Sequence, residues 1–157
     1  MRPVQPTRVR DLLLLAGVAV GVGYLLVRDY YGSLPALPWT PSVALAGLAV
    51  LEGGMARTTR SRIARRPGTK PVEPLGVARL VALAKATAVV GAVLAGFWAG
   101  AFIYAFLVRD RLAAAGHDAQ VSAIGLVVCL VLVAAAIWLE QSCRTPDPPQ
   151  EDRPLAD

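Results

Sequence analysis

Residues 65–100, RRPGTKPVEPLGVARLVALAKATAVVGAVLAGFWAG, change from a basic, proline-rich segment into a long apolar run. Proline interrupts a helix that arrives from earlier residues, whereas Pro74 suits the first turn of a new one. Arg79 and Lys85 lie near the start of that new helix, and no charge follows them in the apolar run. A cation costs about 2.5–3.5 kcal/mol at the centre of a bilayer, but near its surface a long side chain reaches the headgroups. The stretch therefore predicts a membrane-spanning helix over residues 76–108 with its cationic end at one membrane surface.

The composition of the whole chain agrees with a membrane protein. Of its 157 residues, 55% are hydrophobic, and the mean hydropathy is +0.53. Soluble domains are usually about 45–50% apolar. The formal net charge of +5 is typical of some nucleic-acid-binding proteins, but here the basic residues flank apolar segments. A membrane explains both features, so we expect no nucleic-acid partner.

Three other apolar segments have the length of a membrane span, at residues 8–27, 41–60 and 121–140. A spanning helix needs about 20 mostly apolar residues to cross roughly 30 Å of hydrocarbon. The first segment resembles a cleavable signal peptide, but large side chains and a charge follow it where a cleavage site needs small residues. We therefore expect an all-α fold, an up-down bundle of four transmembrane helices over residues 1–143, followed by a disordered acidic, proline-rich tail at 144–157.

Basic residues are distributed unevenly between the segments that connect these spans. The N-terminal segment and the connector between the second and third spans are rich in arginine, whereas the other two connectors are nearly balanced in charge. Because Lys and Arg remain preferentially on the cytoplasmic side, we expect both termini in the cytoplasm of a multi-pass protein of the plasma (inner) membrane. The basic rim is either an orientation signal alone or a site for anionic lipid headgroups. It consists of Arg57, Arg60, Arg62, Arg65, Arg66, Lys70 and Arg79.

Glu52 is the one acidic residue in the interior of a predicted span, because Asp11 and Glu140 lie near the ends of theirs. Ionisable groups in the membrane interior are costly and often functional. One interpretation is a buried ion pair with Lys85, which lies at a similar depth on the next helix. The other is a carboxylate that relays protons or binds a cation, as in small multidrug exporters.

Two pairs of glycines are spaced four residues apart, Gly17 with Gly21 and Gly96 with Gly100. Small residues at this spacing let helix backbones approach closely in lipid. The pairs predict helix packing within one bundle, with homodimerisation or contact with a partner membrane protein as alternatives.

The sequence has no pattern typical of an enzyme or a metal site. His117 is the only histidine, and no cysteine lies near it. Cys129 and Cys143 would be about 21 Å apart on a continuous helix, too far for a disulfide. Nucleophilic triads, phosphate-binding loops and paired carboxylates within a span are absent. We expect no catalytic residue, metal or cofactor.

The segments RPGTKPVEPL, VARLVALAKA and GFWAG, together with the Ala/Gly-rich span, resemble an uncharacterised actinobacterial membrane family. The resemblance extends from TRVRDLLLLA to about Trp138. It implies a small four-helix membrane protein with a domain of unknown function, often encoded beside folate (pterin) biosynthesis genes. The family supplies no catalytic residues.

These observations favour a non-enzymatic accessory or structural subunit that acts through helix packing and a basic cytoplasmic rim. The alternative is a small oligomeric transporter, or a transporter subunit, that uses Glu52. Four short helices enclose little room for a polar path, so this alternative needs oligomerisation.

Overall fold

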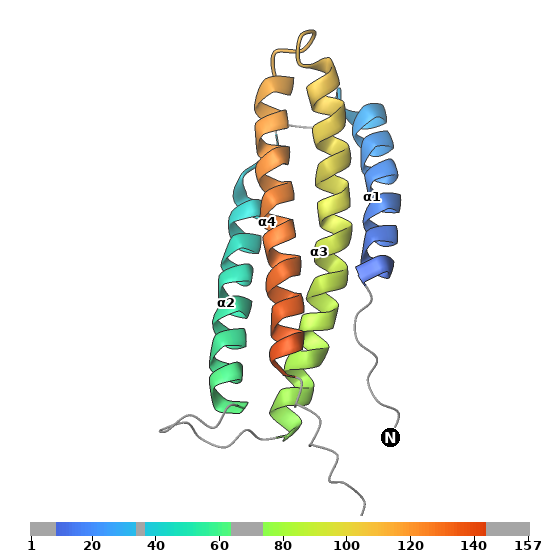
Figure 1. Cartoon of the computed structure of the whole chain (residues 1–157). Helices are drawn as coiled ribbons and strands as arrows, with labels where there is room; N and C mark the ends of the chain where they lie inside the picture. Colours follow the sequence, from blue (N-terminus) through green and yellow to red (C-terminus); the bar gives the residue numbers. More distant parts are fainter. Residues whose placement is uncertain (1–8, 34–36, 64–73, 144–157) are drawn as a thin grey trace, which may run out of the picture.

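The computed structural model describes residues 9–33, 37–63 and 74–143, and four α-helices account for most of them (Figure 1). The predicted all-α fold is confirmed for these residues, and the predicted tail at 144–157 lies outside them. The helices are α1 (Val9–Tyr30), α2 (Thr40–Ile63), α3 (Pro74–Val108) and α4 (Ala115–Ser142).

The longest helix, α3, begins at Pro74, the proline that the sequence places in a first helical turn. It ends at Val108, where the N–H groups of Arg111 and Leu112 donate to the Val108 carbonyl and reverse the chain. With 35 residues α3 is about 52 Å long, and it exceeds the roughly 30 Å of a hydrocarbon core. Its first turns therefore extend past the apolar part of the other helices.

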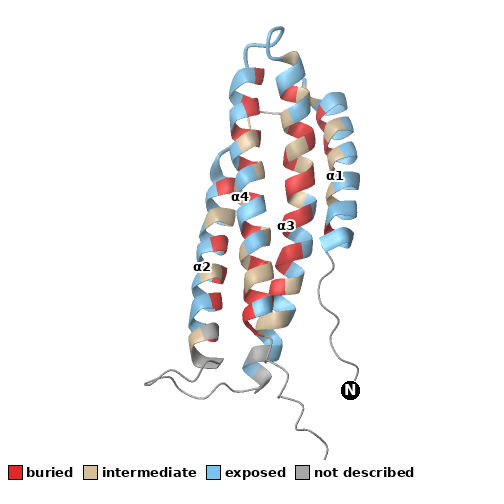
Figure 2. Ribbon diagram, in the orientation of Figure 1, coloured by how far each residue is buried: buried red, intermediate tan, exposed pale blue. Residues whose placement is uncertain are grey.

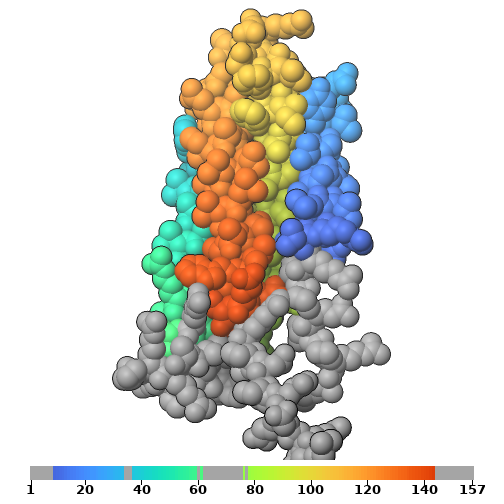
Figure 3. Space-filling model, in the orientation of Figure 1, coloured from blue at the N-terminus to red at the C-terminus, as the bar shows by residue number. Residues whose placement is uncertain are grey.

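The four helices form an open row in the order α1, α3, α4 and α2 (Figure 1). Consecutive helices run in opposite directions, so α1 and α3 are parallel to each other, and so are α2 and α4. In the described residues α1 packs mainly on α3, α3 on α4, and α2 on α4. The visible face of the space-filling view places α1 and α2 at opposite edges (Figure 3). The first two helices, although consecutive in the chain, are therefore not neighbours in the row.

The contacts within the row consist mostly of small residues. Alanines and glycines form much of the buried surface of α3, and the Trp98 ring lies against Gly125 of α4. A Cβ on Gly125 would lie 2.6 Å from this ring. Buried positions lie along the facing sides of the helices, and exposed positions lie on the outside (Figure 2). Small side chains thus allow the backbones to pack closely where apolar attraction between helices is weak in lipid.

Large apolar side chains cover the outside of the row. Exposed examples occur on all four helices, including Val18, Val50, Val90 and Val127. Three helices are long and apolar enough to cross a membrane, namely α1, the segment Ala78–Val108 of α3, and α4. A folded soluble protein rarely exposes this much contiguous apolar surface. The arrangement therefore fits a membrane protein.

The second helix, α2, does not reach the apolarity that we expected of the span at 41–60, and it is not among those three. The reason lies in its composition, because Glu52 lies in its middle and Arg57 and Arg60 in its second half. Its buried side nevertheless carries polar residues, and its exposed side carries large apolar ones such as Val50 and Leu51. The residues of its buried stripe are Ser42, Ala49, Glu52, Ala56 and Thr59.

Candidate functional site

The carboxyl group of Glu52 lies between α2 and the α3–α4 pair. Only 1% of the residue is exposed, which makes Glu52 one of the most completely buried large side chains among the described residues. One turn further along α2, Ala56 packs against Ala84 of α3 and Leu139 of α4. The three helices therefore close around the side of α2 that carries the carboxyl group.

Both carboxyl oxygens of Glu52 lack a hydrogen-bond partner among the described residues. The Thr87 hydroxyl of α3 lies near them, but it donates to the Leu83 carbonyl at 3.1 Å and makes no hydrogen bond with the carboxyl group. A buried polar group without a partner costs free energy, and a buried charge costs more. Glu52 is therefore an exception to the rule that buried polar groups are satisfied.

Lys85, the predicted ion-pair partner of Glu52, makes no hydrogen bond to its carboxyl group in the described residues. Lys85 is half-buried on α3 and has an interaction of its own, and the Glu52 oxygens accept no hydrogen bond from it. Thr87 lies two residues further along the same helix, and that spacing turns a side chain by about 200°. Lys85 therefore projects from a different side of α3 than Thr87 does.

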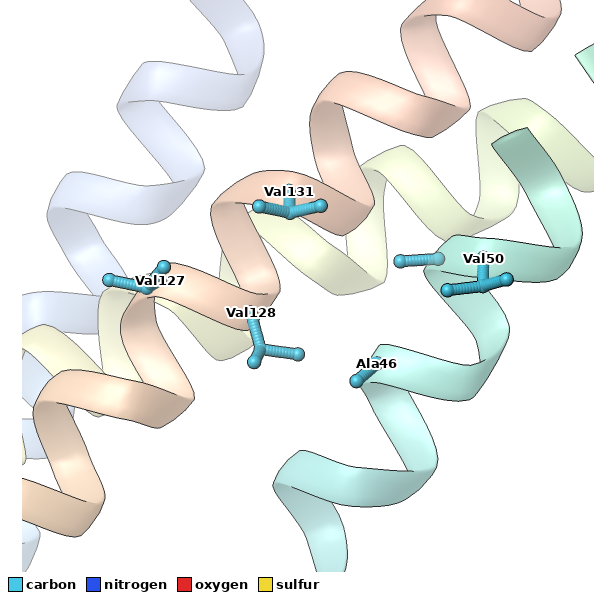
Figure 4. Close-up of a pocket in the computed structure, with 6 residues that line it drawn as sticks. Ala46, Val50, Val127, Val128 and Val131 are labelled. Atoms are coloured by element: carbon cyan, nitrogen blue, oxygen red, sulfur yellow. The ribbon is translucent and has the colours of Figure 1, made fainter. Parts of the chain in front are cut away.

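An apolar groove lies between α2 and α4 (Figure 4). Its volume is about 230 Å³, and it opens to the outside of the row. In the close-up, Val128 of α4 and Ala46 of α2 project into the gap between the two helices. The lining residues are Ala46, Ala49, Val50, Val127, Val128 and Val131. Small side chains leave this gap because neither helix supplies a large residue to fill it.

Two further hydroxyl groups are buried without a partner near the first turns of α2 and α4. They belong to Ser42 and Ser122, and neither Oγ has a hydrogen-bond partner in the described part of the chain. Ser42 lies ten residues before Glu52, which is about 15 Å along α2. The α2 interface thus carries unsatisfied polar atoms at two levels along its length.

The predicted basic rim is only partly described. The Arg57 guanidinium carbon of α2 lies 5.8 Å from the centre of the Trp138 ring of α4, and Arg79 of α3 is exposed. Arg60 and Arg62 lie on α2. Arg65, Arg66 and Lys70 lie outside the described residues. The described rim cations thus occur at the same end of the row, where α2 ends and α3 begins.

The predicted glycine pairs lie in different surroundings. Gly96 and Gly100 of α3 face α1, where a Cβ on Gly100 would lie 2.5 Å from the Tyr24 nitrogen and one on Gly96 would contact the Ala16 carbonyl. Gly17 and Gly21 have no such neighbour, because a Cβ on either would meet nothing within 4 Å. The glycine of α1 in this contact is Gly23, where a Cβ would lie 2.8 Å from the Phe97 carbonyl oxygen. Packing within one chain therefore involves Gly23 on α1, and Gly17 and Gly21 lie on its exposed side.

A second polar cluster, centred on Asp118, lies at the opposite end of the row from the Arg-rich segment. Its carboxylate accepts a hydrogen bond from the Tyr31 hydroxyl at 2.7 Å and another from the Leu37 N–H at 3.1 Å. His117 Nδ1 lies 3.5 Å from the same carboxylate, and the His117 ring contacts Trp39 edge-to-face. Asp118 is buried although it lies in the first turn of α4.

Sequence reasoning singled out His117 in this region but missed the role of its neighbour. The hydrogen bonds of Asp118 join α4 to the residues that connect α1 with α2. The aromatic residues between α1 and α2, Tyr31 and Trp39, were the only signal of such a contact. Among the described residues no group of three metal-ligating side chains is present, and His117 lies with a single carboxylate.

Comparison with known families adds one match. The family model described as "Protein of unknown function (DUF3180)" matches residues 12–147. The chain belongs to the DUF3180 family. No curated protein and no solved structure matches it. The match includes Glu52, the groove and the Asp118 cluster of this DUF3180 protein, and it assigns no activity to any of them.

Two chemical properties distinguish the site of this DUF3180 protein. Glu52 supplies an acid that is sealed from water by three helices. The groove between α2 and α4 supplies an apolar surface of Ala and Val side chains that is open to the outside of the row. The first suits an acid that keeps its proton, and the second suits contact with another apolar helix.

Proposed function

We propose that this DUF3180 protein is a multi-pass plasma-membrane protein that acts as a non-enzymatic accessory or structural subunit. In this proposal all four helices cross the bilayer, and the termini and the connector between α2 and α3 lie in the cytoplasm. The basic rim would contact anionic lipid headgroups there. The observation that carries the proposal is the exposed face of α2, where large apolar side chains lie beside an open groove at the end of the row.

The pattern of α2 supports insertion in spite of its lower apolarity. Polar side chains of membrane helices almost always face the interior of the protein, and Glu52 and Thr59 do so here. Apolar side chains, including Val50 at 75% exposed, cover the other side. In water this pattern would be unfavourable on both sides of the helix.

The groove supports a role in helix–helix contact. Its Ala and Val lining leaves room for side chains of another apolar helix, and close packing of small residues is the main attraction between helices in lipid. We infer that a transmembrane helix of another subunit packs between α2 and α4.

A photo-crosslinking amino acid at Val50, at the groove, tests this inference in native membranes. The matched control carries the same group at Val90, an exposed valine on α3 that does not line the groove. We expect a discrete protein adduct from position 50 and only lipid adducts from position 90. Lipid adducts alone from both positions would contradict an accessory role through this face.

The unpartnered carboxyl of Glu52 favours a second candidate, a small transporter or transporter subunit. The described residues of one chain surround Glu52 with apolar helix contacts, so a polar path would need more than one copy. The mass of the particle in a native-like bilayer tests this candidate. A strictly monomeric particle would exclude the oligomeric transporter.

A further inference from the structure

Glu52 carries a chemical property that a packing role does not need. A side chain that only fills space between α2, α3 and α4 would be apolar, because an isostere without charge avoids the cost of desolvation. Here a carboxyl group is 1% exposed, and both of its oxygens are without a hydrogen-bond partner in the described residues. The carboxyl group therefore has to be neutral or to gain a partner that the described chain does not supply.

The charged side chains that the structure describes on these helices do not supply that partner. Arg57 on α2 lies over the Trp138 ring. Lys85 on α3 and Glu140 on α4 each have an interaction elsewhere, and none of the three donates a hydrogen bond to Glu52. An ionised carboxylate would thus remain without a hydrogen-bond donor between apolar helices, which is strongly unfavourable compared with the same group in water.

A metal ion fits this site poorly, whereas a proton fits it well. Calcium takes about six to eight oxygen ligands and magnesium about six, whereas Glu52 offers two oxygens, and the described residues contain no group of three metal-ligating side chains. A proton needs one oxygen only and removes the charge. The neutral acid also gains an O–H donor of its own.

We propose that Glu52 is an intramembrane proton-binding site, which holds its proton while α2 packs against α3 and α4. Hydrophobic carbodiimides are a chemical probe for such a site, because they partition into lipid and react with the protonated acid. The acid proton moves to a carbodiimide nitrogen, and a carboxyl oxygen bonds to the central carbon. Migration of the acyl group to nitrogen then gives a stable N-acylurea, and no group leaves. The proposal stands whether or not a partner helix occupies the groove.

Infrared spectroscopy of the full chain in lipid nanodiscs at neutral pH tests the protonation state directly. We expect a carbonyl stretch of a protonated carboxylic acid that is lost in Glu52→Gln and kept in Glu140→Gln. The amide is isosteric with the neutral acid, so we also expect Glu52→Gln to keep the melting temperature of the wild type. Coinciding spectra of the wild type and Glu52→Gln would overturn the proposal, as would a large fall in melting temperature with no loss of the band.

Labelling of the wild-type protein provides a second measurement if Glu52→Gln fails to fold. After treatment of membranes with dicyclohexylcarbodiimide, peptide mass spectrometry should find the N-acylurea on Glu52, and its yield should fall as the pH rises. A water-soluble carbodiimide should label the exposed Asp11 and Asp110 instead. Absence of the adduct on Glu52, or equal labelling of Glu52 by both reagents, would overturn the proposal.

Discussion

At the scale of single residues, the structure separates polar groups that have partners from those that do not. Asp118 and Glu52 are both buried carboxyl residues. Asp118 accepts two hydrogen bonds from the connector between α1 and α2, whereas Glu52 accepts none. The Asp118 carboxylate therefore stabilises the contact between α4 and the α1–α2 connector, and the Glu52 carboxyl group remains available for chemistry.

The hydrogen bond between Tyr31 and Asp118 has a measurable effect on stability. Tyr31→Phe removes the hydroxyl donor and leaves one oxygen of the buried Asp118 carboxylate without this hydrogen bond. The free energy of unfolding should fall by about 1–3 kcal/mol. A lower melting temperature in detergent at neutral pH would show this loss. Tyr30→Phe is the matched control, because Tyr30 is its exposed neighbour, and that variant should melt like the wild type.

The same contact predicts a dependence on alkaline pH. Burial, together with the hydrogen bond to Asp118 and its charge, raises the pKa of Tyr31 above the usual value of about 10. The unfolded chain then loses the tyrosine proton first, so the contribution of Tyr31 is complete below about pH 10 and declines above it. The melting temperature of the wild type should therefore fall more steeply above this pH than that of Tyr31→Phe. Parallel curves for the two proteins would contradict the assignment.

Cys143 should react slowly with thiol reagents although it lies just beyond the end of α4. Cys143 is buried against Ala56, Ala84 and Leu139, and this burial raises the pKa of its thiol. Since the thiolate is the reactive form, alkylation near neutral pH should be slower than for an exposed thiol. Gln141→Cys in a Cys143→Ala background supplies that comparison. Equal rates of alkylation by a water-soluble maleimide would contradict the burial of Cys143.

At the scale of elements, glycine spacing identified one side of a helix contact but not the other. Gly96 and Gly100 are spaced to form one face of α3, and that spacing can be recognised in the sequence alone. Helix α1 offers Gly17, Gly21 and Gly23 as possible partners, and the choice of Gly23 depends on how α1 is rotated about its axis. For the same reason, similar depth in the membrane could not show whether the side chains of Glu52 and Lys85 face each other.

Alanine substitutions should distinguish the two glycine faces. In Gly96→Ala and Gly100→Ala the added Cβ meets the backbone of α1, and such overpacking should cost about 1–3 kcal/mol. Gly17→Ala and Gly21→Ala place a methyl group where nothing lies within 4 Å, and alanine is the better helix former. Thermal unfolding in detergent should therefore separate the α3 variants from the α1 variants. Equal destabilisation of all four would contradict the α1–α3 contact.

At the scale of the whole molecule, hydropathy and proline placement predict the helices but not their neighbours. The start and end of α3 follow from Pro74 and from the charges after Val108, which are local signals. The row, with α1 and α2 at opposite edges, depends on contacts between distant segments. These contacts consist largely of alanines and glycines, which are too frequent in this sequence to single out a partner.

The orientation of the row in the membrane gives the last prediction. Alkaline phosphatase, which is active only after export from the cytoplasm, can be fused after Ser33, Arg66 or Leu112. If all four helices cross and the basic rim stays in the cytoplasm, the fusions after Ser33, Arg66 and Leu112 should be active, inactive and active, in that order.

An inverted protein would give the opposite pattern. If α2 does not cross, the fusions after Ser33 and Arg66 should both be active and the fusion after Leu112 inactive, because the single crossing of α3 then returns the chain to the cytoplasm. The fusion after Arg66 therefore tests α2, whose buried side carries Glu52.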